Sequence, residues 1–130
     1  MKIDIAIDNN SILDDGATAV TVSAAAEVGG AAKVIDFGAD YARNPVLAVT
    51  FDISSADRTT ADETYDLQVE FSSTSVFTAV EGEATLPILL LGKYTIVSEV
   101  KNRYMRAYYV NGGTTPILGR NSVHYASYTK

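Results

Sequence analysis

Residues 103–113, Arg-Tyr-Met-Arg-Ala-Tyr-Tyr-Val-Asn-Gly-Gly, carry the pattern on which the fold prediction depends. Successive side chains of a strand point to opposite faces, so every second residue shares a side. One side of this stretch holds Tyr104, Arg106, Tyr108 and Val110. Aromatic and β-branched residues suit a half-buried pleated surface, and the Asn-Gly-Gly end tolerates the positive φ of a tight turn. The stretch is predicted to be a strand that ends in a turn and has other strands as partners.

The same alternation appears in the rest of the chain. It is clearest at residues 65–71, where four apolar residues are expected to face the core and the three polar residues between them to face water. Further strands are expected at 17–23, 33–37, 46–53, 76–80, 84–91, 94–97 and 122–128. Strands 46–53 and 65–71 are expected to pair antiparallel across an exposed polar loop at 54–64. Many short strands without an amphipathic helix predict a single all-β domain, either a sandwich or a barrel.

The first ten residues also alternate, with Ile3, Ile5 and Ile7 on one face. They are expected to form either an edge strand of the domain or an extended arm that adds to the sheet of a neighbouring molecule. The predicted organisation is therefore an N-terminal arm or edge strand at 1–10 and a β-sandwich at 11–130.

The charges are unevenly distributed along the sequence. The net charge of −6 argues against a surface that binds nucleic acid as a whole. Residues 1–92 contain four basic and fifteen acidic residues, whereas residues 93–130 contain six basic residues and one acid. Either these charges intermix on the folded surface, or they leave one acidic and one basic side suited to docking on a charged partner.

Residue types that carry out catalysis are sparse. The chain has no cysteine, and His124 is its only histidine. No Gly-x-Ser-x-Gly motif accompanies this histidine, and one histidine without cysteine is a poor basis for a zinc site. The acid pairs Asp66/Glu70 and Glu81/Glu83 are interpreted as the solvated faces of strands. The chain is expected not to be an enzyme and to have no metal or cofactor.

Arginines and tyrosines are interleaved at residues 103–109, as on surfaces that bind single-stranded nucleic acid or sugars. However, the alternation places Tyr109 on the side opposite Tyr104 and Tyr108. At least one of these two sets is therefore expected to pack in the core. Packing is favoured over nucleic-acid binding for this stretch.

Several short motifs follow one another in a fixed order. They are Lys-Val-Ile-Asp-Phe-Gly at 33–38, a strand at 45–51, Asp-Leu-Gln-Val-Glu-Phe-Ser-Ser at 66–73, Phe-Thr at 77–78, Leu-Gly at 91–92, and Arg-Tyr-Met-Arg at 103–106 leading into Tyr-Val-Asn-Gly-Gly at 109–113. This order resembles the small capsid cement (decoration) proteins of tailed bacteriophages, especially those of short-tailed Bordetella-type phages. The resemblance covers residues 31–119, and the arm at 1–8 matches no part of the pattern.

The resemblance implies a jelly-roll-like antiparallel β-sandwich that sits on the outside of an icosahedral virion after synthesis in the host cytoplasm. Its partners would be the major capsid protein and further copies of itself in a homodimer or homotrimer, without direct nucleic-acid or membrane contact. We expect Arg103 and Arg106 to face the capsid, and Ile3, Ile5 and Ile7 to add a strand to a neighbour. The alternative is a carbohydrate-binding jelly-roll module displayed on a virion.

Overall fold

The structure, a computed structural model, describes residues 2–4, 11–41 and 46–129. The regular elements in these ranges are all strands, and none is a helix long and apolar enough to span a membrane. The strands are β1 (Lys2–Asp4), β2 (Ile12–Asp14), β3 (Ala24–Ala25), β4 (Glu27–Val28), β5 (Ala31–Ala32), β6 (Ile35–Asp36), β7 (Val46–Ala56), β8 (Thr64–Ser72), β9 (Gly82–Pro87), β10 (Gly92–Glu99), β11 (Tyr104–Gly112) and β12 (Leu118–Thr129).

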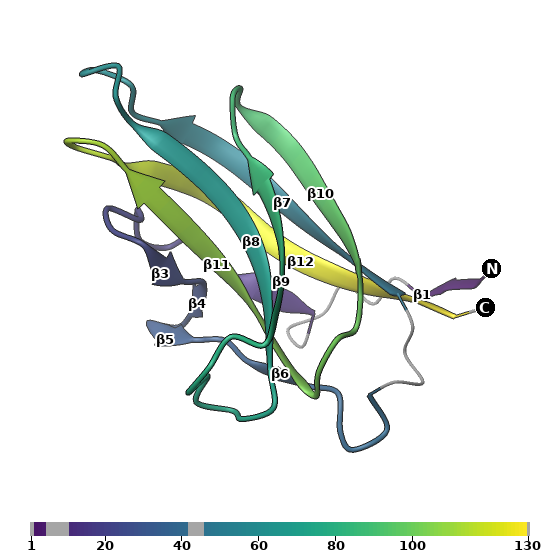
Figure 1. Cartoon of the computed structure of the whole chain (residues 1–130). Coiled ribbons are helices and arrows are strands. Elements are labelled where there is room, and N and C mark those ends of the chain that lie inside the picture. Colours follow the sequence, from purple (N-terminus) through teal and green to yellow (C-terminus); the bar gives the residue numbers. More distant parts are fainter. Residues whose placement is uncertain (1, 5–10, 42–45, 130) are drawn as a thin grey trace.

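Two antiparallel sheets pack together (Figure 1). The first, which we call the β7 sheet, has the order β1-β12-β7-β10, and β2 also pairs with β12. The second, the β8 sheet, has the order β3-β11-β8-β9, and β6 also pairs with β11. Strands β4 and β5 form a separate hairpin. The prediction of an all-β antiparallel sandwich is confirmed, while the jelly-roll assignment stays a prediction.

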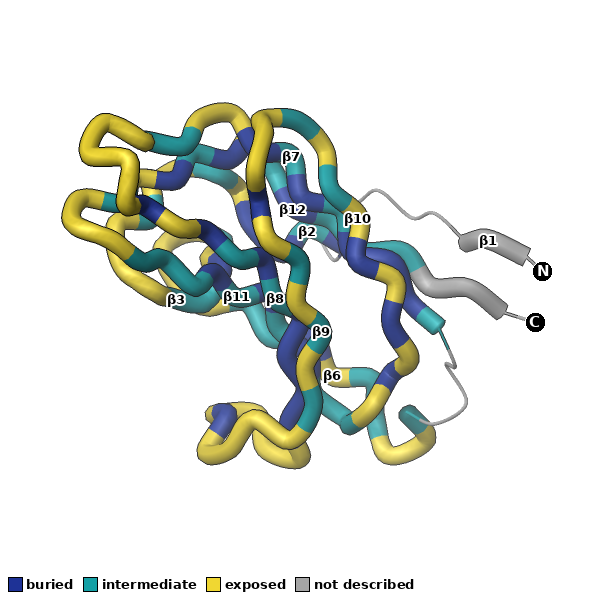
Figure 2. The backbone as a smooth tube through the Cα atoms, turned by 45° about the horizontal axis from the view of Figure 1, so that its top comes forward, coloured by how far each residue is buried: buried dark blue, intermediate teal, exposed yellow. Residues whose placement is uncertain are grey.

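The core lies between the two sheets because alternate residues of the long strands are apolar. Tyr65, Leu67, Val69 and Phe71 of β8 are all buried, as their spacing predicted. From β7, the core receives Leu47, Val49, Phe51 and Ile53. Buried and exposed residues consequently alternate along the strands in Figure 2. The two sheets also meet through an edge-to-face contact between Phe51 and Tyr109, whose ring centroids are 6.2 Å apart.

The strand predicted at residues 103–113 is confirmed as β11. It pairs with β8 along its whole length, and its other edge pairs with β3 and β6. Gly113 follows it with a φ of 95°, a conformation that side chains disfavour. Tyr109 lies in the core, whereas Tyr104 and Tyr108 are half-buried on the outer face of the β8 sheet. The expected separation of the tyrosines into two sets is therefore confirmed.

Four strand predictions are wrong at least in part, and the first is the strand at 84–91, which ends at Pro87 before an exposed turn. Strands β7 and β8 lie in different sheets, because residues 57–63 cross from one sheet to the other, so the expected pair does not form. Residues 76–80 form no strand, and Phe77 has a φ of 51°, in the left-handed region that strands exclude. Of residues 17–23, only Val20 makes a β-bridge, which joins it to Leu118.

The N-terminal strand β1 pairs with the end of β12 at the edge of the β7 sheet. For residues 2–4, which include Ile3, this arrangement matches the edge-strand alternative. Ile5 and Ile7 lie outside the described residues, so strand addition to a neighbour stays a prediction.

Candidate interaction surfaces

The outer face of the β8 sheet gathers ion pairs from three strands. Arg103, just before β11, donates from Nε to Oδ1 of Asp36 at 2.8 Å and from Nη2 to Oδ2 at 3.1 Å. Arg106 in β11 donates from Nε to Oε1 of Glu70 in β8 at 2.9 Å. We call these four residues, together with Phe77, the motif cluster. It joins β11 to β6 on one side and to β8 on the other.

Phe77, in the connection between β8 and β9, packs against the Arg106 side of this cluster. The Arg106 guanidinium lies 4.3 Å from the centroid of the Phe77 ring and 5.0 Å from that of Tyr108. Cation–π attraction and burial of the ring offset the cost of the left-handed backbone at Phe77. The connection is thus held against the sheet by one buried side chain.

The ion pairs of the motif cluster determine how much of Arg103 and Arg106 is exposed to a partner. The side chain of Arg106 is only 19% exposed, and its partner Glu70 is 6% exposed. Glu70 does lie on the outer face, but it is buried beside Arg106 instead of facing water as expected. Arg103 remains accessible, with 43% of its side chain exposed. Its hydrogen bond holds the pKa of the Asp36 carboxyl below the usual value.

Acids from the acidic part of the sequence neutralise the arginines of the basic part. The three ion pairs are Arg103–Asp36, Arg106–Glu70 and Arg120–Asp14. The structure therefore favours intermixed charges over a basic side of the molecule. Among the side chains that the structure describes, more acids than bases remain without an ion pair. The free surface charge is mainly negative.

The third pair belongs to a buried clamp between the sheets, formed by Asp14, Tyr109 and Arg120. Arg120 of β12 donates from Nε and Nη2 to the two oxygens of Asp14 in β2, each at 2.9 Å. Tyr109 of β11 donates its hydroxyl to Asp14 Oδ2 at 2.5 Å. Burial and the nearby Asp14 charge raise the pKa of the Tyr109 hydroxyl. The clamp ties the two sheets together through hydrogen bonds.

Sequence reasoning missed this clamp. Asp14 belongs to the polar run Asp14-Asp15-Gly16, which gives no sign of burial, and yet its side chain is fully buried. A weak signal existed, because Arg120 is two residues from the apolar Leu118 and so shares its side of the strand.

The ends of six long strands meet at one end of the sandwich, which we call the loop end. Register pairs such as Gly92–Ile53, Gly112–Thr64 and Leu118–Ala56 place these strand ends together. The turn from β9 to β10 projects there (Figure 1) and exposes Leu89 by 78%, Leu90 by 76% and Leu91 by 58%. We call these three residues the leucine tip. Contiguous exposed apolar side chains typically mark a protein contact site.

The acidic connection at 57–63 also lies at the loop end and is firmly held. The Tyr65 hydroxyl donates to the carbonyl oxygen of Asp57 at 2.6 Å and accepts from the amide of Ile117 at 2.9 Å. The hydroxyl and amide of Thr114 both donate to the Asp62 carboxylate, at 2.5 and 3.1 Å. With a further bond from the Thr60 hydroxyl, they lower the pKa of Asp62 to about 2. This connection is predominantly exposed, as predicted, but it is tied to the β11–β12 turn.

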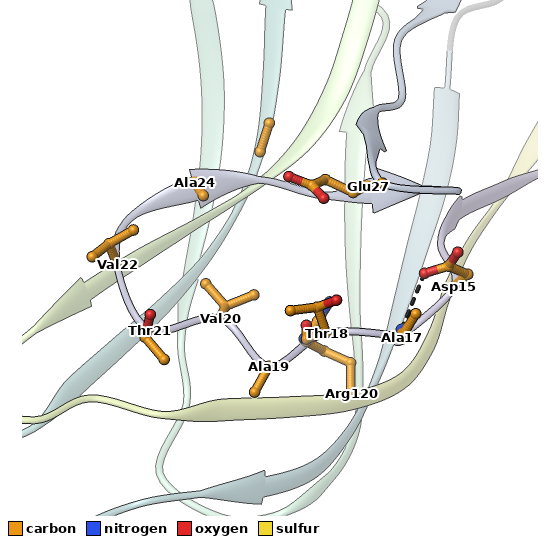
Figure 3. A pocket seen from close by; sticks show the side chains of 12 residues that line it. Asp15, Ala17, Thr18, Ala19, Val20, Thr21, Val22, Ala24, Glu27 and Arg120 are labelled. Atoms are coloured by element: carbon orange, nitrogen blue, oxygen red, sulfur yellow. Dashed lines mark hydrogen bonds between the residues drawn. The ribbon is translucent and has the colours of Figure 1, made fainter.

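A pocket of about 190 Å³ lies beside the clamp, between residues 17–22 and the segment that contains β3 and β4 (Figure 3). Asp15 and Glu27 supply its carboxylates, and Arg120 is the cation among its lining residues. The rest of the lining consists mainly of small apolar and threonine side chains. In Figure 3, Thr18 and Val20 point from the loop toward the strand that carries Glu27.

Of the residues considered for catalysis from the sequence, the structure places Glu83 opposite Glu70 on neighbouring strands of the β8 sheet, whereas His124 lies in the β7 sheet. His124 is half-buried on β12, where it pairs with Thr50 of β7. Glu81 accepts a hydrogen bond from the backbone of Ser73, and Glu70 belongs to the motif cluster. Within the described ranges, no group of three or more His, Cys, Asp or Glu side chains could hold a metal ion.

No protein-family model matches the chain, and no curated protein matches it. The resemblance to cement proteins therefore depends on the sequence motifs and on where they lie in the fold.

Proposed function

We propose that this protein is a capsid cement protein, which binds the outer surface of an icosahedral phage head and stabilises contacts between major capsid protein subunits. One observation carries the proposal: four of the six motifs of the resemblance meet on one face of the β8 sheet. All five members of the motif cluster come from these motifs, although Asp36 and Arg103 are 67 residues apart in sequence. These contacts between segments far apart in sequence support the resemblance.

The order of the strands supports a jelly-roll form of the sandwich. A jelly roll has eight strands in two sheets, arranged as two Greek keys. Here the chain changes sheets between β7 and β8, between β9 and β10, between β10 and β11, and between β11 and β12. With β2 beside β12, and with β3 and β6 beside β11, each sheet is four strands wide. This alternation between sheets is what the proposed form requires.

A cement protein stabilises a shell by mass action. Because it binds the assembled shell and not the separated subunits, each bound copy shifts the equilibrium toward assembly. Many copies act on one head, so modest contacts by each copy suffice. A sandwich held by a buried clamp suits this role because it presents exposed groups, such as the leucine tip, from a rigid body.

The direct test uses heads assembled from the major capsid protein of the phage that carries this gene. We expect the purified protein to sediment with these heads, to saturate at a fixed number of copies per shell, and to raise the temperature at which the heads dissociate. Separated capsid subunits are the control and should not bind. Heads that neither bind the protein nor gain thermal stability would contradict the proposal.

A carbohydrate-binding module is the second candidate, favoured by the half-buried Tyr104 and Tyr108 on the outer face of the β8 sheet. Sugar-binding sites commonly use partly exposed aromatic rings. Against this use, Arg103 lies 5.1 Å from the Tyr104 ring centroid, and Arg106 also lies over Tyr108. One face of each ring is therefore occupied. Binding on a glycan array that disappears in Tyr108→Ala would favour this candidate over the first.

A further inference from the structure

We propose that the pocket beside Asp15 and Glu27 receives a lysine or arginine side chain of the major capsid protein. This inference rests on the proposed function and adds to it the chemistry of one contact. Three features of the pocket support it: its negative charge, its largely apolar lining and its rigid outer wall.

The charge of the pocket is negative. The Asp15 amide donates to the carbonyl oxygen of Glu27 at 3.1 Å, which holds these two acidic residues side by side. The amides of Gly29 and Ala17 donate to the Asp15 carboxylate and lower its pKa, so Asp15 stays ionised. Glu27 is exposed and has no ion pair within the described part of the chain.

Arg120 does not cancel this charge. Its Nε and Nη2 are bound to Asp14, and its Nη1 donates to the carbonyl oxygens of Thr18 and Leu118. The buried Asp14 already balances the guanidinium charge. The attraction of Arg120 for Asp15 is the smallest of the influences on the Asp15 pKa. Asp15 and Glu27 therefore leave the pocket with a net negative charge, which favours a cationic ligand.

The lining selects a cation with an aliphatic stem. The pocket walls include Ala17, Ala19, Val20, Val22, Ala24 and Ala25. Lysine and arginine side chains bury their methylene stems against apolar surface while the charged group remains with polar partners. A bare metal ion would leave these apolar walls uncovered. A side chain that enters over the alanines and ends beside an acidic residue of the lining uses both parts of the pocket.

The outer wall of the pocket is fixed before any ligand binds. Val20 exchanges two backbone hydrogen bonds with Leu118, each 2.9 Å long. Asn111 donates from Nδ2 to the Val20 carbonyl oxygen at 3.0 Å, and Arg120 holds the Thr18 carbonyl oxygen at 2.6 Å. A preformed site loses little conformational freedom on binding, so even one side chain can contribute to docking.

The first part of the test uses the full chain and small probes. Nα-acetyl-lysine amide is titrated into the ¹⁵N-labelled protein, with Nα-acetyl-norleucine amide as the uncharged probe of the same stem. We expect the amide signals of residues 17–22 and 30 to shift with the lysine probe and not with the norleucine probe. Glu27→Gln should weaken the binding of the lysine probe by about twofold to fivefold. Glu99→Gln, which removes an exposed acid on β10, should not.

The second part uses heads. If Glu27→Gln lowers occupancy on heads and Glu99→Gln does not, the capsid protein is the source of the basic side chain. Equal shifts with both probes, no effect of Glu27→Gln on the lysine probe, or the same shifts with calcium chloride alone would each overturn the inference. Failure of the wild-type protein to bind heads would instead refute the proposed function and the capsid protein as the source, while the probe titration still decides whether the pocket takes a basic side chain.

Discussion

Arg120 is the side chain whose loss should most affect stability, because it neutralises a fully buried acid. Removing one partner of a buried ion pair leaves an uncompensated charge, which costs about 3–5 kcal/mol. We therefore expect Arg120→Met to lower the free energy of unfolding by about that amount in urea denaturation. Tyr109→Phe removes one hydrogen bond to Asp14 and should cost about 1–3 kcal/mol.

Arg106→Met is the matched control for Arg120→Met, since it removes the same charge from a partly exposed pair. It should destabilise the protein less than Arg120→Met. An equal loss in both variants, or a loss below about 1 kcal/mol for Arg120→Met, would show that the clamp does not hold the sheets together.

Arg103 is the accessible arginine of the motif cluster and the one to test for contact with a shell. Its pair with Asp36 is exposed, so it contributes little to stability. Arg103→Glu should leave the fold intact and lower occupancy on heads at moderate salt, as measured by co-sedimentation. Lys93→Glu makes the same charge change on β10 and should have the smaller effect. Unchanged occupancy in Arg103→Glu would remove this residue from the interface.

At the scale of elements, the connection between β7 and β8 predicts a specific dependence of stability on pH. The pKa of Asp62 is about 2 in the folded protein, against a value of 3.8 for an unperturbed aspartate. Because the folded pKa is lower, the Asp62 contribution is fully present above pH 3.8 and is lost as the pH falls toward 2. The free energy of unfolding, measured by urea denaturation between pH 5 and 2, should therefore fall less steeply with decreasing pH for Asp62→Asn than for the exposed control Asp40→Asn. The same pH dependence in both variants would contradict the hydrogen bonds that Thr114 and Thr60 donate to Asp62.

The same connection contains Ala61 at a φ of 62°, a conformation that costs a residue with a Cβ about 1–2 kcal/mol. Ala61→Gly relieves this cost but increases the freedom of the unfolded chain. We expect a net gain of about 0.5–1 kcal/mol in thermal or urea unfolding. Gly113→Ala is the opposite case, since its Cβ would lie 2.6 Å from the carbonyl oxygen of Asp62. Destabilisation by Ala61→Gly would show that the backbone there is not strained.

The long strands were predictable from sequence because apolar and polar residues alternate along them. This alternation has one strong cause, which is the burial of one face of each strand. Strands β8 and β11 follow it almost to the residue. The alternation does not say which strands pair, so it missed that β7 and β8 lie in different sheets. The alternation also predicts a strand at residues 76–80 that does not form, because the position of Phe77 depends on its contact with Arg106 of β11. Asp14 and the pocket were missed for the same reason, since both depend on contacts between segments far apart in sequence.

At the scale of the whole molecule, the buried ion pairs and the exposed apolar groups are separated. Of the two arginines that the sequence suggested for docking, Arg106 is largely used inside the fold and Arg103 is partly exposed, whereas the leucine tip stands free at the loop end. The groups most available for burial against a shell are therefore apolar. Apolar burial provides a non-directional gain of about 25 cal/mol for each Å² removed from water, and this gain does not depend on matching charges.

The double variant Leu89→Ser, Leu90→Ser tests this contact. Both side chains are more than three-quarters exposed, so their replacement should change the free energy of unfolding by less than about 0.5 kcal/mol for each residue. Occupancy on heads should fall, and the loss should persist at high salt, because apolar contacts are not screened by ions. Val97→Ser removes another exposed apolar side chain, on β10, and should leave occupancy unchanged. Full occupancy of the double variant would place the shell contact elsewhere, and an equal loss in Val97→Ser would mean that exposed apolar area in general, and not the tip, drives binding.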